Sequence, residues 1–147
     1  MHEPNAIKDV GMTESNSATF RERLTVLAQS LQLAPQVAEN QVLDRMALSF
    51  RKLLNFLAED NNLTQSVFLL PPEGPETQTM LTAVISKNLA FSQQDKLFRN
   101  DIPAELLAQC FTGMLVQLAH QAASPAQRHQ NSLACAKLFC EGVWLRE

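Results

Sequence analysis

The last third of the chain, residues 101–147, constrains the fold most, because its apolar residues recur in adjacent pairs along a helix. The pairs are Leu106/Leu107, Cys110/Phe111, Met114/Leu115 and Leu118/Ala119. They form a stripe two residues wide at helical spacing, which is more apolar surface than one neighbouring helix covers. We therefore expect a helical protein that buries this stripe against a second copy of itself.

Two start signals divide this region into two helices. Asp101 is a candidate N-cap, Pro103 follows in the first turn and Glu105 is acidic near the helix start. Ser124 and Pro125 suit the N-cap and first helical position of the next helix, and a glutamine three residues after Ser124 completes a capping-box pattern. The apolar seam predicted for this last helix is Leu133, Ala136, Cys140, Val143 and Trp144.

Composition and charge narrow the possible classes of protein. The 147 residues are 46% hydrophobic and 18% charged, which fits one folded domain with less charge than the usual ~25%. The net charge of −3 disfavours direct binding of nucleic acid by this chain alone. Three cysteines, an odd number, favour a reducing compartment. Residues 1–19 lack the apolar run of a secretory signal, and no stretch approaches the ~20 apolar residues of a membrane span. We expect a cytoplasmic protein without a membrane contact.

The upstream residues predict further helices after a polar start. Residues 1–17 have no hydrophobic period and are expected to form a flexible arm, with an all-helical domain over residues 18–147. A helix is predicted from near Ser17 to the Ala34-Pro35 break, and another over residues 43–57. Residues 63–70 are predicted to be helical, residues 71–75 to be a loop, and residues 76–91 to be a long helix. The fold class is therefore all-α, a bundle of about five or six helices.

No catalytic or metal-binding motif is present. His120 and His129 are nine residues apart, and Cys135 and Cys140 are five apart on different helix faces, so neither pair has a zinc spacing. The chain lacks a G-x-S-x-G elbow, a P-loop and a dinucleotide fingerprint. We expect a protein that is not an enzyme and that needs no cofactor.

The remaining candidate is a binding pocket between the helices. Methionine and phenylalanine line adaptable apolar cavities, and several of them lie on the predicted seams. The candidate ligand-binding residues are Met46, Phe50, Met80, Val84, Phe91 and Phe111. The same residues at helical spacing also fill an ordinary core, so both interpretations stay open.

Three segments in the second half resemble the C-terminal regulatory domain of the tetracycline-repressor (TetR) family. The helix start carries Arg99, Asp101, Glu105 and Ala108 at the family's spacing, and Thr112-Gly113-Met114-Leu115 fits its small-Gly-apolar-apolar helix centre. The end of the last helix, Leu138-Phe139-Cys140-Glu141-Gly142, fits its L-F-x-x-G pattern. The resemblance covers about residues 17–144 and depends on the order of these degenerate motifs.

The resemblance implies a dimer and a ligand cavity. In the family the last two long helices pair with those of a second subunit, which here implies residues 101–121 and 125–145. The implied interface residues are Leu106, Gly113, Met114, Leu118, Leu138 and Trp144. The family's cavity lies among the middle helices and implies a small apolar ligand bound by faces of residues 43–57, 80–91 and 106–114.

The N-terminus departs from the family pattern. Family members begin with a three-helix region of roughly 45–50 residues that enters the DNA major groove, whereas about 17 residues precede the first predicted seam here. We expect the DNA-binding head to be absent or degenerate in this chain. The leading hypothesis is a ligand-sensing, dimerising regulatory domain of a TetR-like transcriptional regulator, which could also sequester ligand or pair with a complete regulator. The alternative is a helical adaptor that binds proteins and has no ligand pocket.

Overall fold

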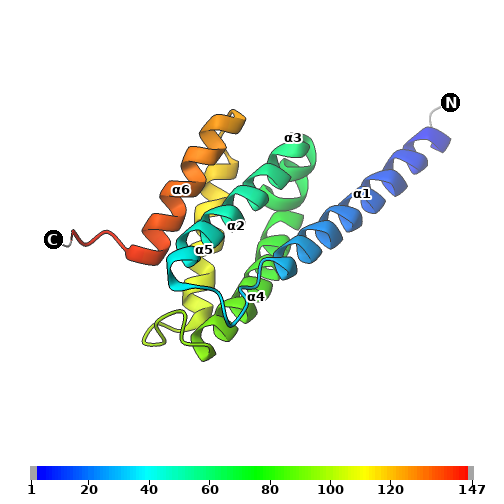
Figure 1. The fold of residues 1–147 in the computed structure, drawn as a ribbon. Helices are drawn as coiled ribbons and strands as arrows, with labels where there is room; N and C mark the ends of the chain where they lie inside the picture. Colours follow the sequence, from blue (N-terminus) through cyan, green and yellow to red (C-terminus); the bar gives the residue numbers. More distant parts are fainter. Residues whose placement is uncertain (1–2, 146–147) are drawn as a thin grey trace.

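The computed structural model describes the backbone of residues 3–145 and the side chains of residues 16–145. Within this range the chain forms six α-helices and one π-helix and no strand, so the expected all-α bundle is confirmed (Figure 1). The elements are α1 (Glu3–Ser30), α2 (Glu39–Glu59), α3 (Asn61–Leu63), the π-helix η1 (Thr64–Leu69), α4 (Glu73–Gln94), α5 (Ala104–Ala119) and α6 (Pro125–Glu141).

Two helix pairs and one crossing helix build the bundle. Helix α2 packs along α6, α4 packs along α5, and α1 lies against α4. Figure 1 shows α2 in front of α5, with α6 on the side of the C-terminus and α1 on the side of the N-terminus. The core between them centres on the fully buried side chains of Phe50, Phe111 and Leu115.

Helix α1 begins earlier than the sequence predicted. Its first residue is Glu3 rather than one near Ser17, and Ser30 is its last. Pro4 lies in the first turn, where its missing N–H costs nothing, and a packed helix propagates into polar residues more easily than a new helix starts. Residues 1 and 2 of the predicted arm lie outside the described residues, and the division into a flexible arm and a domain stays a prediction.

Helix α2 confirms the clearest prediction from hydrophobic periodicity. The predicted residues 43–57 lie within Glu39–Glu59. Its buried side chains follow the helical period: Met46, Ala47, Ser49, Phe50, Leu53, Leu54, Phe56 and Leu57. Helix α2 therefore presents one apolar face to the other helices.

The predicted loop over residues 71–75 is wrong in its second half, because α4 begins at Glu73. Pro75 is tolerated there, since the N–H groups of a helix's first turn have no partner within the helix. Gly74 is buried, and its N–H donates to the Leu70 carbonyl at 2.8 Å. The preceding segment is the short α3 and the π-helix η1, so its predicted helical character is confirmed.

The start of α5 differs from the prediction as well. Asp101 is not its N-cap: Pro103 precedes the first residue, Ala104, and no side chain caps the helix. The Asp101 carboxylate instead accepts a hydrogen bond from Arg99 Nε at 2.6 Å. The three residues before the helix are a loop, in which the Ile102 carbonyl accepts a hydrogen bond from Gln93 Nε2 at 2.8 Å, and the helix spans Ala104–Ala119 rather than residues 101–121.

The start of α6 is confirmed and its end is corrected. Ser124 Oγ accepts a hydrogen bond from the Gln127 N–H at 3.1 Å, and Pro125 is the first helical residue. The helix ends at Glu141, because Gly142 takes a φ of 75° that other residues rarely adopt. Of the predicted seam, Ala136 is buried as expected, whereas the other buried residues are Ser132 and Cys135, and Trp144 lies beyond the helix.

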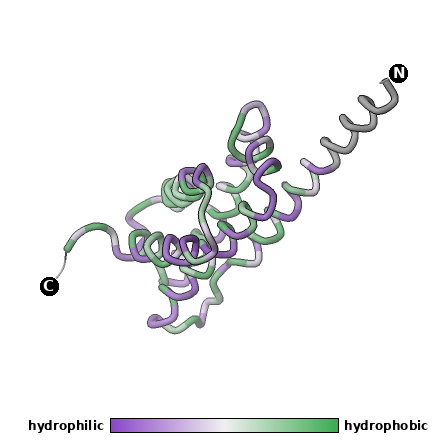
Figure 2. The backbone as a smooth tube through the Cα atoms, turned by 90° about the horizontal axis from the view of Figure 1, so that it is seen from above, coloured by the Kyte–Doolittle hydropathy of each residue, from purple (hydrophilic) through white to green (hydrophobic). Residues whose placement is uncertain are grey.

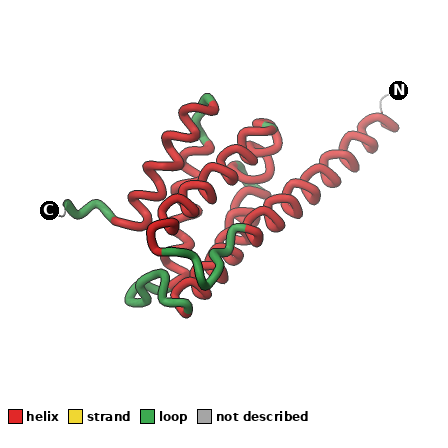
Figure 3. The backbone as a smooth tube through the Cα atoms, viewed as in Figure 1, coloured by secondary structure: helices red, strands yellow, loops and turns green. Residues whose placement is uncertain are grey.

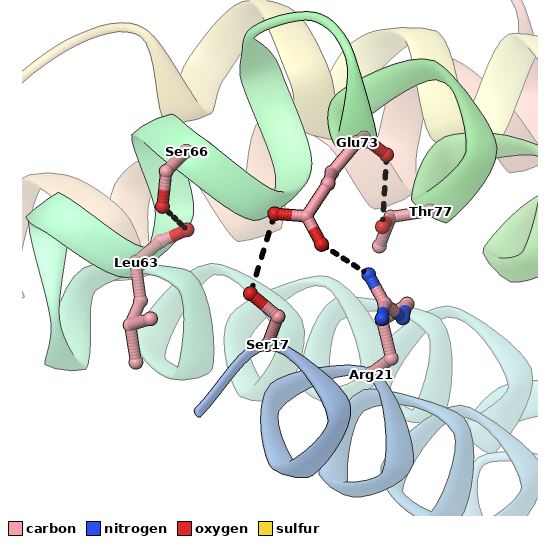
Figure 4. A network of polar contacts seen from close by, with 6 residues as sticks. All are labelled: Ser17, Arg21, Leu63, Ser66, Glu73 and Thr77. Carbon is pink, nitrogen blue, oxygen red and sulfur yellow. Dashed lines mark hydrogen bonds and ion pairs between the residues drawn. The ribbon is translucent and has the colours of Figure 1, made fainter. Parts of the chain in front are cut away.

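A polar cluster joins α1 to the first turn of α4 (Figure 4). Glu73 accepts a hydrogen bond from Ser17 Oγ at 3.2 Å and forms an ion pair with Arg21 Nη1 at 2.8 Å. At the other end of α1, Asn88 Nδ2 donates to the Ala28 carbonyl at 2.9 Å. Helix α1 is therefore fixed along α4 by polar contacts at both ends of its buried face.

Candidate functional site

A small cavity lies in the core where the end of α1 meets α2, α4 and α5. Its volume is about 20 Å³, and its walls include Met46 of α2, Ile85 of α4 and Phe111 of α5. Phe50 stacks on Phe111 with ring centroids 4.2 Å apart and planes inclined by 22°. Stacking of this kind stabilises the core beyond the area it buries, so we expect the aromatic side of the cavity to be rigid.

Three neutral polar side chains also face the cavity. Ser49, Asn88 and Ser92 line it, and both serines are at least 95% buried. Ser49 Oγ donates to the Arg45 carbonyl at 3.0 Å, and Asn88 donates to α1. No charged side chain lines the cavity among the described residues. The cavity can therefore offer hydrogen bonds but no counter-charge.

The six predicted ligand-binding residues do not converge on one space. Met46 and Phe111 line the cavity, and Phe50 packs behind Phe111. Met80 is half-buried beside α1, where its sulfur lies 3.3 Å from Thr25 Oγ1, whose hydroxyl donates to the Arg21 carbonyl at 2.9 Å. Val84 is half-buried and Phe91 is 38% exposed. Their role in binding a ligand stays a prediction.

Sequence reasoning missed the polar members of the cavity. Asn88 and Ser92 are four residues apart on α4, and they alternate with the apolar seam residues Ile85 and Leu89. Spacings of three and four place all of them on one helix face. The signal for them in the sequence was the presence of two polar residues within an apolar seam, whereas the candidate residues were chosen for their Met and Phe side chains.

The candidate dimer residues occupy the more exposed parts of the last two helices. Leu106 is 49% and Leu138 45% exposed, Gly113 is exposed, and Met114 and Leu118 are half-buried. Trp144 is 80% exposed in the segment after α6. Figure 2 shows hydrophobic residues in this segment, next to the C-terminus. The paired stripe of α5 is thus divided: Phe111 and Leu115 enter the core, and Leu106 and Cys110 do not.

The chain is similar to a bacterial regulator of transcription. Over 99 residues it is 31% identical to a protein of Bacillus subtilis (strain 168) described as the uncharacterized HTH-type transcriptional regulator YdgC. The match covers 67% of this chain and 51% of that protein, so it spans about half the length of the curated relative. No protein-family model and no solved structure matches the chain.

Among the described residues, the cysteine thiols and the possible metal ligands bear on chemical reactivity. Burial raises the pKa of the Cys135 thiol, and burial together with the charge of Glu141 raises the pKa of Cys140 to about 11, although Cys140 as a whole residue is exposed. Both thiols are therefore protonated at neutral pH and are weak nucleophiles. No group of three or more His, Cys, Asp or Glu side chains lies close enough to hold a metal ion in the part of the chain that the structure describes.

None of the described helices is long and apolar enough to cross a bilayer.

Proposed function

We propose that this chain is the regulatory part of a TetR-like transcriptional regulator, which forms a homodimer and senses a small molecule. Two observations support the regulatory role. The chain is 31% identical to an HTH-type transcriptional regulator over 99 residues, and its all-α bundle has a small cavity with a partly polar lining between the middle helices. Contact with DNA would belong to a helix-turn-helix head in a longer form or in a partner, and the site of action would be the cytoplasm.

The exposed apolar side chains of α5 and α6 carry the dimer proposal. Leu106 and Leu138 are nearly half exposed, and exposed large apolar side chains are candidates for a protein interface. Gly113 lies on the same helix as Leu106, and a Cβ built on it meets no atom within 4 Å. A second helix can therefore approach the α5 backbone closely at Gly113 without displacing any atom of its own chain.

The dimer is tested by measuring the mass of the purified chain with light scattering. We expect twice the chain mass, and we expect Gly113→Arg and Leu138→Glu to reduce it to the mass of one chain. Because a Cβ built on Gly113 meets no atom within 4 Å, we expect Gly113→Arg to leave the folded monomer intact. Gln29→Arg, which adds the same charge at an exposed position of α1, is the matched control. A wild-type chain that is monomeric at all concentrations would refute the dimer.

One observation favours the second candidate, a helical adaptor that binds other proteins. The space between Met46, Ile85 and Phe111 holds only about 20 Å³, so the core is nearly filled. A filled core with exposed leucines on α5 and α6 is what an adaptor requires. A monomeric chain that binds no small molecule would favour the adaptor over the sensor.

A further inference from the structure

The cavity beside Asn88 is covered by two loops at one end of the bundle. Residues 31–38 join α1 to α2, and residues 95–103 join α4 to α5; Figure 3 shows both loops at the same end of the molecule. Leu33 of the first loop and Phe98 of the second both line the cavity. Side chains on loops move at lower cost than side chains within packed helices, so this wall is the one that can open.

The volume shows that the cavity is too small for an organic ligand as it stands. About 20 Å³ is the space of roughly one water molecule, and an aromatic ring such as benzene occupies cavities of about 150 Å³. Met46 is the flexible member of the lining on α2, because a methionine side chain has three rotatable bonds. Displacing Leu33 and Phe98 while Met46 changes rotamer enlarges the cavity without breaking a helix.

The lining decides which molecules the opened cavity would accept. No described lining residue is charged, so an ionic ligand would lose its hydration without gaining a counter-ion. Asn88 and Ser92 lie one helical turn apart on α4, so both polar groups face the same side of a space that is otherwise apolar except for Ser49. An amide has two N–H donors and one carbonyl acceptor, so the single bond from Asn88 Nδ2 to Ala28 leaves capacity for an occupant.

We infer that this cavity is the closed form of a site for a small neutral molecule with an apolar body and one hydroxyl or carbonyl group. The molecule enters between residues 31–38 and 95–103 and forms hydrogen bonds with Asn88 and Ser92. This inference rests on the ligand-sensing part of the proposed function and adds the chemical class of the ligand.

The test compares three probes of similar shape on the whole chain. Phenol is neutral at pH 7 and carries a hydroxyl, benzene lacks the hydroxyl, and benzoate is charged. The readout is the methyl resonance of Met46 in protein labelled with ¹³C at the methionine methyl groups, assigned with Met46→Leu. We expect a saturable shift of this resonance with phenol, a dissociation constant about fivefold higher for benzene than for phenol, and no shift with benzoate.

Two serine variants separate the hydrogen bond from general effects on the core. Ser92→Ala should weaken the binding of phenol about fivefold and leave the affinity for benzene unchanged. Ser132→Ala removes a hydroxyl that is equally buried but lies on α6, where it bonds to the Arg128 carbonyl, so it should change neither affinity. Both variants remove one oxygen atom and are expected to fold.

The outcomes distinguish this inference from the proposed function. Equal binding of phenol and benzene, or phenol binding that Ser92→Ala leaves unchanged, would overturn the inferred ligand class and leave a ligand-binding domain in place. Binding of benzoate at the affinity of phenol would overturn the requirement for a neutral ligand. If light scattering shows a dimer and no probe gives a saturable shift of the Met46 resonance, this cavity is not the ligand site, while the proposed dimer stands.

Discussion

Gly74 lies where the first turn of α4 passes directly over the end of η1. A Cβ built on it would lie 2.8 Å from the Leu69 carbonyl carbon and 3.1 Å from the Phe68 carbonyl oxygen. Both atoms belong to the backbone, which cannot rotate away as a side chain can. The close approach of two chain segments, rather than an unusual φ, therefore explains a glycine at this position.

Gly74→Ala is expected to destabilise the fold by about 1–3 kcal/mol, because the added methyl group forces the backbone of η1 or α4 to shift. The measurement is urea unfolding followed by circular dichroism at one protein concentration. Gly113→Ala is the matched control, since its Cβ meets nothing within 4 Å and alanine favours a helix over glycine by roughly 1 kcal/mol. Equal effects of the two substitutions would contradict this explanation.

Cys140 gives a prediction about pH. Burial and the Glu141 charge raise its thiol pKa to about 11, so the reactive thiolate forms only in strongly alkaline solution. In a Cys110→Ser, Cys135→Ala variant, the rate of alkylation by iodoacetamide should rise about tenfold per pH unit between pH 7 and 10. A rate that levels off near pH 8.5, the pKa of an unperturbed thiol, would show that Cys140 is not desolvated.

The same pKa shift affects stability. Because ionisation of Cys140 is less favourable in the folded chain than in the unfolded chain, the free energy of unfolding should fall as the pH rises from about 9 to 11.

At the scale of elements, the attachment of α1 to α4 depends on a partly buried ion pair. The side chains of Arg21 and Glu73 are each 33% exposed, and Ser17 adds a hydrogen bond to the same carboxylate. A comparable pair, Arg23 and Glu59, joins α1 to α2 but is more than half exposed. The two pairs share donor and acceptor types and differ in their contact with water, and Arg23 also lies over the Phe56 ring at 5.0 Å.

A double-mutant cycle with Arg21→Met and Glu73→Gln should give a coupling free energy of about 0.5–1 kcal/mol in urea unfolding. The same cycle with Arg23→Met and Glu59→Gln should give a smaller value, because solvent screens the exposed pair. Raising the salt concentration to 0.5 M should reduce the second coupling more than the first. A larger coupling for the exposed pair would mean that the contact with α4 is not the stronger one.

Helix positions could be predicted where an apolar period or a cap was local to the sequence. The period of α2 and the Ser124 cap of α6 are such cases. The start of α4 at Glu73 depends instead on where η1 leads the chain, and Asp101 is drawn into a pair with Arg99. One missed boundary therefore depends on packing between elements, and the other on a side-chain pair two residues apart that takes the place of the expected cap.

At the scale of the whole molecule, the cavity could be predicted only in part. Met46 and Phe111 belong to strong periodic seams and converge as a bundle requires. The other walls come from Leu33 and Phe98, which lie in connecting segments whose path no period describes. Asn88 and Ser92 became part of the cavity because the loops after α1 and α4 lie at the same end of the bundle and bring Leu33 and Phe98 to it.

The proposed dimer predicts that thermal stability depends on protein concentration. Association binds folded chains and not unfolded ones, so each tenfold rise in concentration should raise the melting temperature of the wild type. Gly113→Arg should remove this dependence, since it blocks the approach of a second α5 while leaving the monomer's own contacts intact. Scanning calorimetry between about 5 and 500 μM measures it, with Gln29→Arg as the variant that should behave like the wild type. A concentration-independent melting temperature for the wild type at reversible unfolding would mean that Leu106 and Leu138 stay exposed in solution, and the adaptor would then be the better account of this surface.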